Sequence, residues 1–456
     1  MAFFIKDSKQ KEDKDMKTAN HVRISQCMIV KNEERNIERA LSWGKPLMWE
    51  QIVVDTGSTD HTVEIAQRLG AQVYHFPWIH DFAAAKNYAI EQAKGDWIAF
   101  LDADEYMMPE DAGKLAAVIE NLEPDRFDGI STGWQQLDGE GRIFASGTQI
   151  RFFRNRPDIR YRRRIHEQLE SIEGRKLQIG DVVASLSIFH TGYQGEAYAK
   201  KTKSGRNRLL ILEELKEHPE DYEMMGYMGD ECLDDGEREE ARAWYQRAIL
   251  HMPSCLSEED QRSAATYTRL LILLTEREDA SWDSAEEIYL QAAERLPKEA
   301  DFDYIAGRFF AASGNARQAV HYLEGALGKL NAYGCSNRAL ILAGNLMEAY
   351  ELLVRCCYEA GESQKCVSYA VACLRADRYA MPVLSRLLLV LASDNGSGSQ
   401  EYPRVLEFFA GLYDFSALKD RLFLIKAAQR TECKGFAAFA ADRLLNQQER
   451  AAMGLD

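Results

Sequence analysis

Strand and helix patterns alternate through residues 24–101, and this alternation constrains the fold more than any other feature of the chain. Four apolar segments rich in β-branched and aromatic residues have the length of strands. They cover residues 24–30, 51–55, 71–76 and 97–101. Helical patterns separate them, one of which covers residues 83–93. This order predicts an α/β fold with a mostly parallel sheet and helices on both of its faces.

Polar residues follow three of the predicted strands directly. Asn32 and Glu33 come after the first strand, Asp55 ends the second and Asp102 follows the fourth. Ligands of parallel sheets bind beyond the carboxyl ends of the strands. We therefore expect these side chains to share one site.

The fourth predicted strand ends in Asp102-Ala103-Asp104-Glu105. Because alternate side chains of a strand point to the same face, Asp102 and Asp104 can leave the sheet edge together. Hard carboxylate oxygens suit Mg²⁺ or Mn²⁺, and a cation held by few carboxylates keeps positions open for a substrate diphosphate. A solvated acidic turn is the alternative. Glu105 is either a group behind the metal ligands or a helix cap.

The second strand leads into a turn and a helix start at residues 56–60, where Ser58 is a plausible N-cap. Asp55 could accept hydrogen bonds from a uracil N–H or from ribose hydroxyls. A turn-forming aspartate is the alternative explanation.

Residues 151–164 contain seven arginines and one aspartate in an otherwise acidic chain. Such a run could offset the charge of a diphosphate or of an acidic acceptor, or it could be a solvated strand face. His166 and Glu167 follow it. His166 could bind a metal or orient an acceptor, and Glu167 could remove the acceptor proton.

Further strand patterns cover residues 129–135, 143–153 and 188–193. The last of these contains His190, a second candidate metal ligand. Lys201, Lys203, Arg206 and Asn207 follow on a segment that could close over phosphates or could simply be the basic start of a helix.

The chain after about residue 200 has an almost wholly helical pattern. Small residues, an aromatic and a proline recur there with the spacing of tetratricopeptide repeats. The matches are Gly229, Ala241, Tyr245, Ala248 and Pro253; Ala285, Tyr289, Ala292 and Pro297; and Gly307, Ala319, Leu323 and Ala326. A generic helical bundle is the alternative. We predict a loose tail at residues 1–20, an α/β domain at 21–200 and a helical-repeat domain at 201–456.

Composition limits the possible partners and the cell compartment. The formal net charge of -16 argues against nonspecific binding to nucleic acid or anionic lipid. The longest aliphatic runs are too short to span a bilayer, and the first residues have no secretory signal pattern. Nine cysteines without a Cys-x-x-Cys pair fit a reducing cytoplasm.

Several of these motifs together resemble glycosyltransferase family two. They lie at residues 27–34, 53–60, 82–87 and 100–105. Residues 165–167 and 190–193, with 201–207, narrow the resemblance to a subgroup that joins a transferase domain to tetratricopeptide-like helices. That subgroup includes the sublancin-type peptide S-glycosyltransferases of glycosylated bacteriocins. Many family members have two adjacent acids where this chain has Asp55-Thr56.

The resemblance implies a Rossmann-like A-type fold (GT-A), a nucleotide-diphosphate sugar donor, Mg²⁺ or Mn²⁺, and inversion at the anomeric carbon. UDP-glucose or a UDP-N-acetylhexosamine is the donor we expect. By resemblance Asp55 contacts the nucleoside, Asp102 and Asp104 contact the diphosphate and metal with His190, and Glu167 is the base beside His166. The further expected donor contacts are Asn32, Glu33, Ser58, Lys86, Asn87, Ala103, Tyr193, Lys201 and Arg206.

The predicted acceptor is a Ser/Thr hydroxyl or a Cys thiol of a peptide or protein, gripped by the helical half. That half could instead form a homodimer. A glycan or lipid acceptor, and an inactive scaffold that docks partners through its repeats, remain alternatives. A nucleotidyltransferase ranks low because no early Gly-rich triphosphate loop is present. A dehydrogenase ranks lower still, since no Gly-x-Gly-x-x-Gly follows the first strand.

Overall fold

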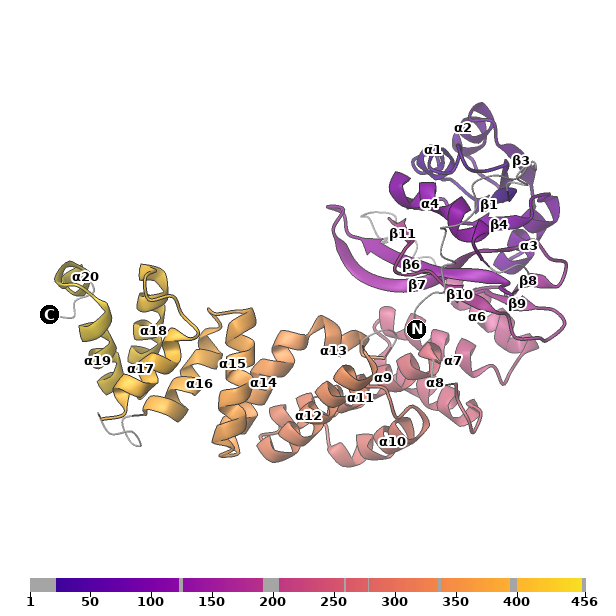
Figure 1. Ribbon diagram of the computed structural model, residues 1–456. Helices are drawn as coiled ribbons and strands as arrows, with labels where there is room; N and C mark the ends of the chain where they lie inside the picture. Colours follow the sequence, from indigo (N-terminus) through magenta and orange to yellow (C-terminus); the bar gives the residue numbers. More distant parts are fainter. Residues whose placement is uncertain are drawn as a thin grey trace. The chain divides into compact units, whose positions relative to one another are not determined.

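The computed structural model describes residues 22–122, 126–191, 205–257, 260–277, 279–334, 338–393 and 400–452. The chain divides into two compact units, residues 1–237 and 238–456 (Figure 1). The predicted tail at residues 1–20 and the predicted domain boundary between residues 200 and 201 lie outside the described residues. Helices α6 (Arg206–Glu217) and α7 (Tyr222–Asp234) belong to the first unit.

A mixed nine-stranded sheet forms the centre of the first unit, in the order β3-β2-β1-β4-β7-β6-β11-β5 with β10 beside β6. Its strands are β1 (Ile24–Val30), β2 (Glu50–Asp55), β3 (Gln72–His75), β4 (Trp97–Phe100), β5 (Glu105–Met107), β6 (Gly129–Leu137), β7 (Ile143–Arg154), β10 (Ile179–Asp181) and β11 (Ser187–His190). Strands β3, β2, β1 and β4 pair in parallel, as predicted. Strand β7 then runs antiparallel to β4 and forms the predicted hairpin with β6.

Helices cover both faces of this sheet, which confirms the predicted layers. On one face, Met28 and Val30 of β1 pack with α1 (Ile37–Ser42) and α2 (Thr62–Arg68), and other strand residues pack with α4 (Pro109–Glu120). On the other face, Cys27 packs with α3 (Phe82–Gln92). The alternation along β1 follows from the two-residue period of a strand.

Strand register brings the predicted polar residues to one edge of the sheet. Val30 pairs with Asp55, and Asp55 pairs with His75 on the next strand. Strand β11 lies between β6 and β5, where His190 pairs with Glu105. The site residues at the ends of β1, β2 and β4 therefore share the carboxyl edge expected for ligands.

The region after Asp102-Ala103-Asp104, the Asp-x-Asp motif, contains a hairpin that was not predicted from the sequence. A separate antiparallel hairpin consists of β8 (Ile159–Arg162) and β9 (Gln168–Ser171). It packs against α3, because the apolar side chains of Ile159 and Tyr161 join the core on that face. The turn of this hairpin carries His166 and Glu167.

The second unit is helical in its described residues, and Figure 1 shows its helices following one another as antiparallel pairs. They are α8 (Arg238–His251), α9 (Gln261–Thr275), α10 (Trp282–Arg295), α11 (Asp301–Ala312), α12 (Ala316–Tyr333), α13 (Leu340–Gly344), α14 (Leu346–Glu359), α15 (Ser363–Ala376), α16 (Met381–Ala392), α17 (Tyr402–Ala410), α18 (Leu418–Arg430), α19 (Lys434–Leu444) and α20 (Gln447–Ala452).

Small residues let these helices approach closely, as the repeat pattern predicts. A Cβ atom at Gly307 of α11 would lie 2.6 Å from Cγ of Leu323 on α12. Ala319 and Ala326, on the same face of α12, are fully buried. Among the described residues, no helix is long and apolar enough to cross a membrane.

Candidate active site

The loops that follow β1 and β2 are joined by side-chain hydrogen bonds. The Asn32 side-chain oxygen accepts from the backbone N–H of Thr59 at 2.8 Å, and the Asn32 backbone N–H donates to Ser58 Oγ at 2.9 Å. Asn32 has a positive φ of 57°, which asparagine tolerates better than most residues. Asn32 and Ser58, both predicted to contact the sugar donor, therefore hold the two loops together at the edge of the sheet.

Asp55 is nearly buried, with 5% of its surface exposed. Its carboxylate accepts from the backbone N–H groups of Gly57 at 3.2 Å and Ser58 at 3.0 Å. His75 Nδ1 lies 3.4 Å from its Oδ2 atom. The carboxylate thus shapes the turn, which is the alternative considered from sequence, and its contact with a nucleoside stays a prediction.

Two cations contact the carboxylate of Asp102. Lys86 Nζ lies 3.5 Å from Oδ1, and Arg151 Nη2 lies 3.1 Å from Oδ2. Burial opposes ionisation of this carboxyl group. The charges of Lys86, Arg151 and His190 outweigh that effect and hold the pKa of Asp102 well below its usual range.

Lys86 also contacts the predicted base. Its Nζ atom lies 2.5 Å from Oε1 of Glu167, and its side chain is almost completely buried. Burial by itself would lower the pKa of Lys86, but the carboxylates of Asp102 and Glu167 raise it above the ordinary value. The fold therefore joins the Asp-x-Asp motif to Glu167 through one buried ammonium group.

The turn that carries Glu167 is held by α6 and α7. The His166 ring stacks on Tyr227 of α7 with centroids 3.6 Å apart. Arg163 forms ion pairs with Glu223 and, at 3.3 Å, with Asp221. Arg163 and His166 both have positive φ angles, 75° and 51°, so the turn needs these contacts to keep its shape.

Asp104 faces His190 across the ends of β4 and β11. The distance from His190 Nε2 to Asp104 Oδ2 is 3.4 Å, and both side chains are largely buried. The backbone oxygen of Asp104 accepts from the N–H and the hydroxyl of Thr191 at 3.0 and 3.1 Å. Within the described part of the chain, Asp102, Asp104 and His190 do not form a three-residue cluster with all ligand atoms within 4.8 Å of one another.

Glu105 does not cap a helix, because it is the first residue of β5. It instead supports the predicted metal ligands from behind. The carboxylate accepts from the N–H of Asp102 at 3.0 Å, from Arg151 Nη2 at 2.7 Å and from Trp134 Nε1 at 2.9 Å. Trp134 was missed in the sequence, since a tryptophan in a hairpin strand carries no local signal of a site.

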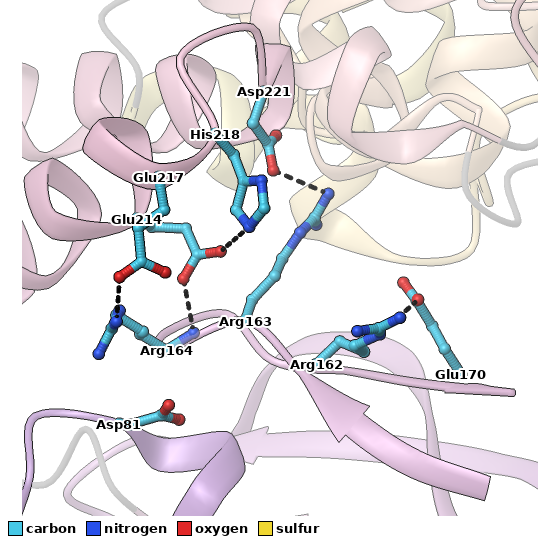
Figure 2. Close-up of a pocket in the computed structure, with 9 residues that line it drawn as sticks. All are labelled: Asp81, Arg162, Arg163, Arg164, Glu170, Glu214, Glu217, His218 and Asp221. Carbon is cyan, nitrogen blue, oxygen red and sulfur yellow. Dashed lines mark hydrogen bonds and ion pairs between the residues drawn. The ribbon is translucent and has the colours of Figure 1, made fainter. Parts of the chain in front are cut away.

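The arginine run spreads over several environments. Arg151 contacts the first acid of the Asp-x-Asp motif, Asp102, at 3.1 Å. Arg162, Arg163 and Arg164 line a pocket of about 460 Å³. Each of them faces a carboxylate there (Figure 2). Arg164 contacts Glu217 and Arg162 lies 3.9 Å from Glu170. The ion pairs of Arg163 and Arg164 stabilise the turn, and contact of the run with a diphosphate stays a prediction.

The other residues predicted to bind the sugar donor contact different parts of the fold. Asn87 donates to the backbone oxygen of Tyr161 and accepts from its N–H, both at 2.9 Å, and so fixes β8. Glu33 accepts from Asn36 at the start of α1. The Arg206 guanidinium lies over the Phe82 ring, 5.2 Å from its centroid. Ala103 is buried between the two acids, whereas Tyr193 and Lys201 lie outside the described residues.

Comparison with known proteins identifies relatives of this chain. The model of Glycosyl transferase family 2 matches residues 25–178. A TPR repeat-containing protein of Synechococcus elongatus is 33% identical over 283 residues, which cover 61% of this chain and 67% of that protein. The SPbeta prophage-derived glycosyltransferase SunS of Bacillus subtilis is 29% identical over 281 residues, covering 61% of this chain and 64% of SunS. The matches span about two thirds of these relatives.

Among solved structures, the chain has a likeness to TarS of S. aureus, residues 1–349. It is 16% identical with a TM-score of 0.30 and covers 60% of this chain and 89% of that chain. Glucosyl-3-phosphoglycerate synthase from Mycobacterium tuberculosis, in complex with Mn²⁺, UDP and glucosyl-3-phosphoglycerate, is 25% identical with a TM-score of 0.22. That likeness covers 26% of this chain and 44% of the synthase. Both TM-scores are low, so neither likeness supports an inference about this chain.

Proposed function

The chain belongs to glycosyltransferase family 2, and we propose that it moves a sugar from a nucleotide-diphosphate donor to a side chain of a peptide or protein. The donor class is a UDP-sugar, with UDP-glucose or a UDP-N-acetylhexosamine first among the candidates. The acceptor atom is a Cys thiol or a Ser/Thr hydroxyl. The sugar inverts its configuration in a single displacement.

The observation that carries the proposal is the contact of Lys86 with both Asp102 and Glu167. A donor site and an acceptor base must lie side by side for a direct displacement, because attack and departure occur in one step. The buried ammonium group holds the two carboxylates in such an arrangement. Asp102 follows the end of β4 and Glu167 lies in the β8–β9 turn, two places that are far apart in the sequence.

Charge around the site supports a divalent cation. Asp102, Asp104, Glu105 and Glu167 supply four carboxylates, whereas the contacts described above supply only Lys86 and Arg151 as permanent cations. A diphosphate would be repelled by this surplus of negative charge. A bound Mg²⁺ or Mn²⁺ would remove the repulsion and stabilise the charge that builds on the leaving diphosphate.

Asp104 and His190 fit such a cation. Two atoms that bind one ion at about 2.1 Å, roughly at right angles, lie about 3 Å apart. The observed 3.4 Å between His190 Nε2 and Asp104 Oδ2 is close to this spacing. One carboxylate oxygen and one imidazole nitrogen form a donor set that suits Mn²⁺. Asp102 then contacts the donor while Lys86 and Arg151 fix its carboxylate.

Glu167 accepts the proton of the acceptor in this proposal. The acceptor sulfur or oxygen forms a bond to the anomeric carbon as the bond from that carbon to the diphosphate oxygen breaks. Lys86 holds the Glu167 carboxylate in place during this step. The helical unit grips the acceptor chain, since stacked helical repeats offer an extended binding surface. Its self-association as a homodimer and the cytoplasmic location stay predictions.

Nucleotide-sugar hydrolysis tests the proposal. We expect the wild-type chain to hydrolyse one UDP-sugar in the presence of Mn²⁺ and to lose this activity with a chelator. Candidate Cys and Ser peptides are then followed by intact mass.

Asp104→Ala should abolish turnover without changing the melting temperature. Glu140→Ala, in the exposed β6–β7 turn, is the matched control and should keep full activity. Full activity of Asp104→Ala would overturn the metal site, and no turnover of any donor would favour the scaffold alternative.

A further inference from the structure

Trp134 of β6 contacts two residues of the candidate active site, Glu105 and His190. Its indole N–H donates to Oε1 of Glu105 at 2.9 Å. Its ring stacks on the imidazole of His190, with centroids 5.0 Å apart and planes inclined by 28°. We propose that Trp134 is a positioning residue that holds His190 and Glu105 so that the site can bind a divalent cation. The inference rests on the metal site of the proposed function.

The indole N–H acts on the acidic motif through Glu105. This carboxylate is buried, with 1% of the residue exposed. It accepts from the backbone N–H of Asp102 and from Arg151, which itself reaches the Asp102 carboxylate. A buried carboxylate needs such donors, because an unpaired charge in the interior is costly. Trp134 thus helps to fix the conformation of the chain where the Asp-x-Asp motif begins.

The indole ring acts on His190. Register brings His190 opposite Glu105 on β5, while Trp134 lies on the other neighbouring strand and pairs with Ile188. The imidazole can therefore rest on the indole face with Nε2 directed at Asp104. Offset stacking of this kind restricts rotation of the imidazole ring. A histidine that must bind a metal gains affinity when its orientation is fixed in advance.

A purely structural role for Trp134 predicts something different. Trp134 also packs against the hydrophobic core under α4. If packing were its whole contribution, removing the ring would lower the melting temperature and leave metal affinity unchanged. A positioning role predicts that metal affinity falls in protein that remains folded, and that an aromatic replacement restores it.

Strand β11 offers a matched control. Phe189 precedes His190 and stacks on Tyr106 of β5, with centroids 5.8 Å apart and planes inclined by 27°. This stack joins β11 to β5, whereas the Trp134–His190 stack joins β11 to β6, and it lies on the opposite face of the sheet. Phe189→Leu therefore removes an aromatic contact next to His190 without touching the imidazole.

The test measures Mn²⁺ binding to the full chain with UDP present, by the loss of the free-ion signal in electron paramagnetic resonance. We expect Trp134→Leu to weaken Mn²⁺ binding by about 10- to 100-fold, as is usual for groups that orient metal ligands. Trp134→Phe keeps a stacking ring and should recover most of this loss. Phe189→Leu should bind Mn²⁺ like the wild type. Far-ultraviolet circular dichroism and melting curves establish that each variant is folded.

Each outcome has one meaning. Wild-type affinity in Trp134→Leu would overturn the inference, and so would an equal loss in Phe189→Leu, because general loosening of β11 would explain both. If Trp134→Leu does not fold, Trp134→Met, with a longer side chain that fills more of the space, is judged by the same criterion. Absence of Mn²⁺ binding in the wild type would instead refute the metal site of the proposed function.

Discussion

Lys86 Nζ lies 2.5 Å from Oε1 of Glu167, and this buried ion pair links α3 to the β8–β9 turn. The same nitrogen lies 3.5 Å from Asp102. An ammonium group between two carboxylates offsets the repulsion that would otherwise drive them apart. The stability of the first unit and the geometry of the candidate site therefore depend on one side chain.

Replacement of Lys86 by methionine should destabilise the first unit. The variant keeps the length of the side chain but leaves two carboxylates without the ammonium between them. Breaking a buried ion pair from one side costs about 3–5 kcal/mol. We expect the free energy of unfolding to fall by about 3 kcal/mol in urea titrations. Adding Glu167→Gln to this variant should recover part of the loss.

Lys114 provides the comparison for this experiment. It is exposed on α4 and pairs with Asp111 at 2.9 Å. Surface pairs of this kind contribute about 0–1 kcal/mol, so Lys114→Met should leave unfolding almost unchanged. Equal stability of Lys86→Met and the wild type would show that the buried pair is not what holds the turn.

The identity of the acceptor atom can be read from Glu167→Gln. A hydroxyl depends strongly on a base, whereas a thiol with an ordinary pKa of about 8.5 loses its proton readily. We expect the variant to lose transfer to a Ser peptide by at least about 100-fold and transfer to a Cys peptide by much less. The remaining Cys transfer should increase between pH 6.5 and about 8.5. Intact-mass rates on paired peptides measure both, and wild-type rates on both peptides would remove Glu167 as the base.

The anchoring of the turn can be tested at two adjacent arginines. Arg163 is mostly buried and pairs with Glu223 of α7 and with Asp221 just before it. Arg162 is exposed and lies 3.9 Å from Glu170 (Figure 2). Arg163→Gln should release the turn and lower the turnover number of transfer by about 10- to 100-fold, because small displacements of a catalytic group are costly. The Michaelis constant for the donor should stay unchanged.

Arg162→Gln is the control for that experiment and should transfer sugar at the wild-type rate. A double-mutant cycle of Arg163→Gln with Glu223→Gln should show a coupling energy of about 0.5–3 kcal/mol. Additive effects of the two changes would mean that α7 does not hold the turn through this pair.

Much of the sheet could be predicted because its strands are continuous runs with a short local period. The first predicted strand, residues 24–30, coincides with β1. Because the neighbouring strands run parallel to it, the sequence also predicts that Asp55 and Asp102 lie at the same edge of the sheet. Helix α4 could also have been found, since Pro109 is followed by Glu110 and Asp111, a typical helix start. These signals lie within one short stretch of chain.

Contacts between distant segments could not be predicted in this way. Sequence indicated Lys86 and Glu167 as separate site residues, but only the packing of the β8–β9 hairpin on α3 brings them together. The arginine run was interpreted by its charge, yet its partners come from α6 and α7, a tertiary relationship that no local pattern contains. The same holds for Trp134 and His190, which meet through strand order.

A buried carboxyl group makes the helical unit sensitive to pH. Burial, with the nearby charge of Asp301, raises the pKa of Glu299 to about 7. A carboxyl group with a raised folded-state pKa contributes stability below its ordinary value of about 4.3 and loses it as the pH rises through 7. The loss by pH 8 is at most about 4 kcal/mol. Glu299→Gln should therefore flatten the fall in melting temperature between pH 5 and 8, whereas equal slopes would exclude this group.

The repeat packing of the helical unit predicts opposite effects for two glycines. A Cβ at Gly307 would lie 2.6 Å from Leu323 Cγ and 3.2 Å from the Leu323 backbone nitrogen, so Gly307→Ala forces α11 and α12 apart. We expect the free energy of unfolding to fall by about 1–3 kcal/mol. Gly328 is exposed within α12 and a Cβ there meets nothing within 4 Å. Gly328→Ala should raise stability by up to about 1 kcal/mol through helix propensity. Urea titrations that give both variants the same sign would contradict close repeat packing at Gly307.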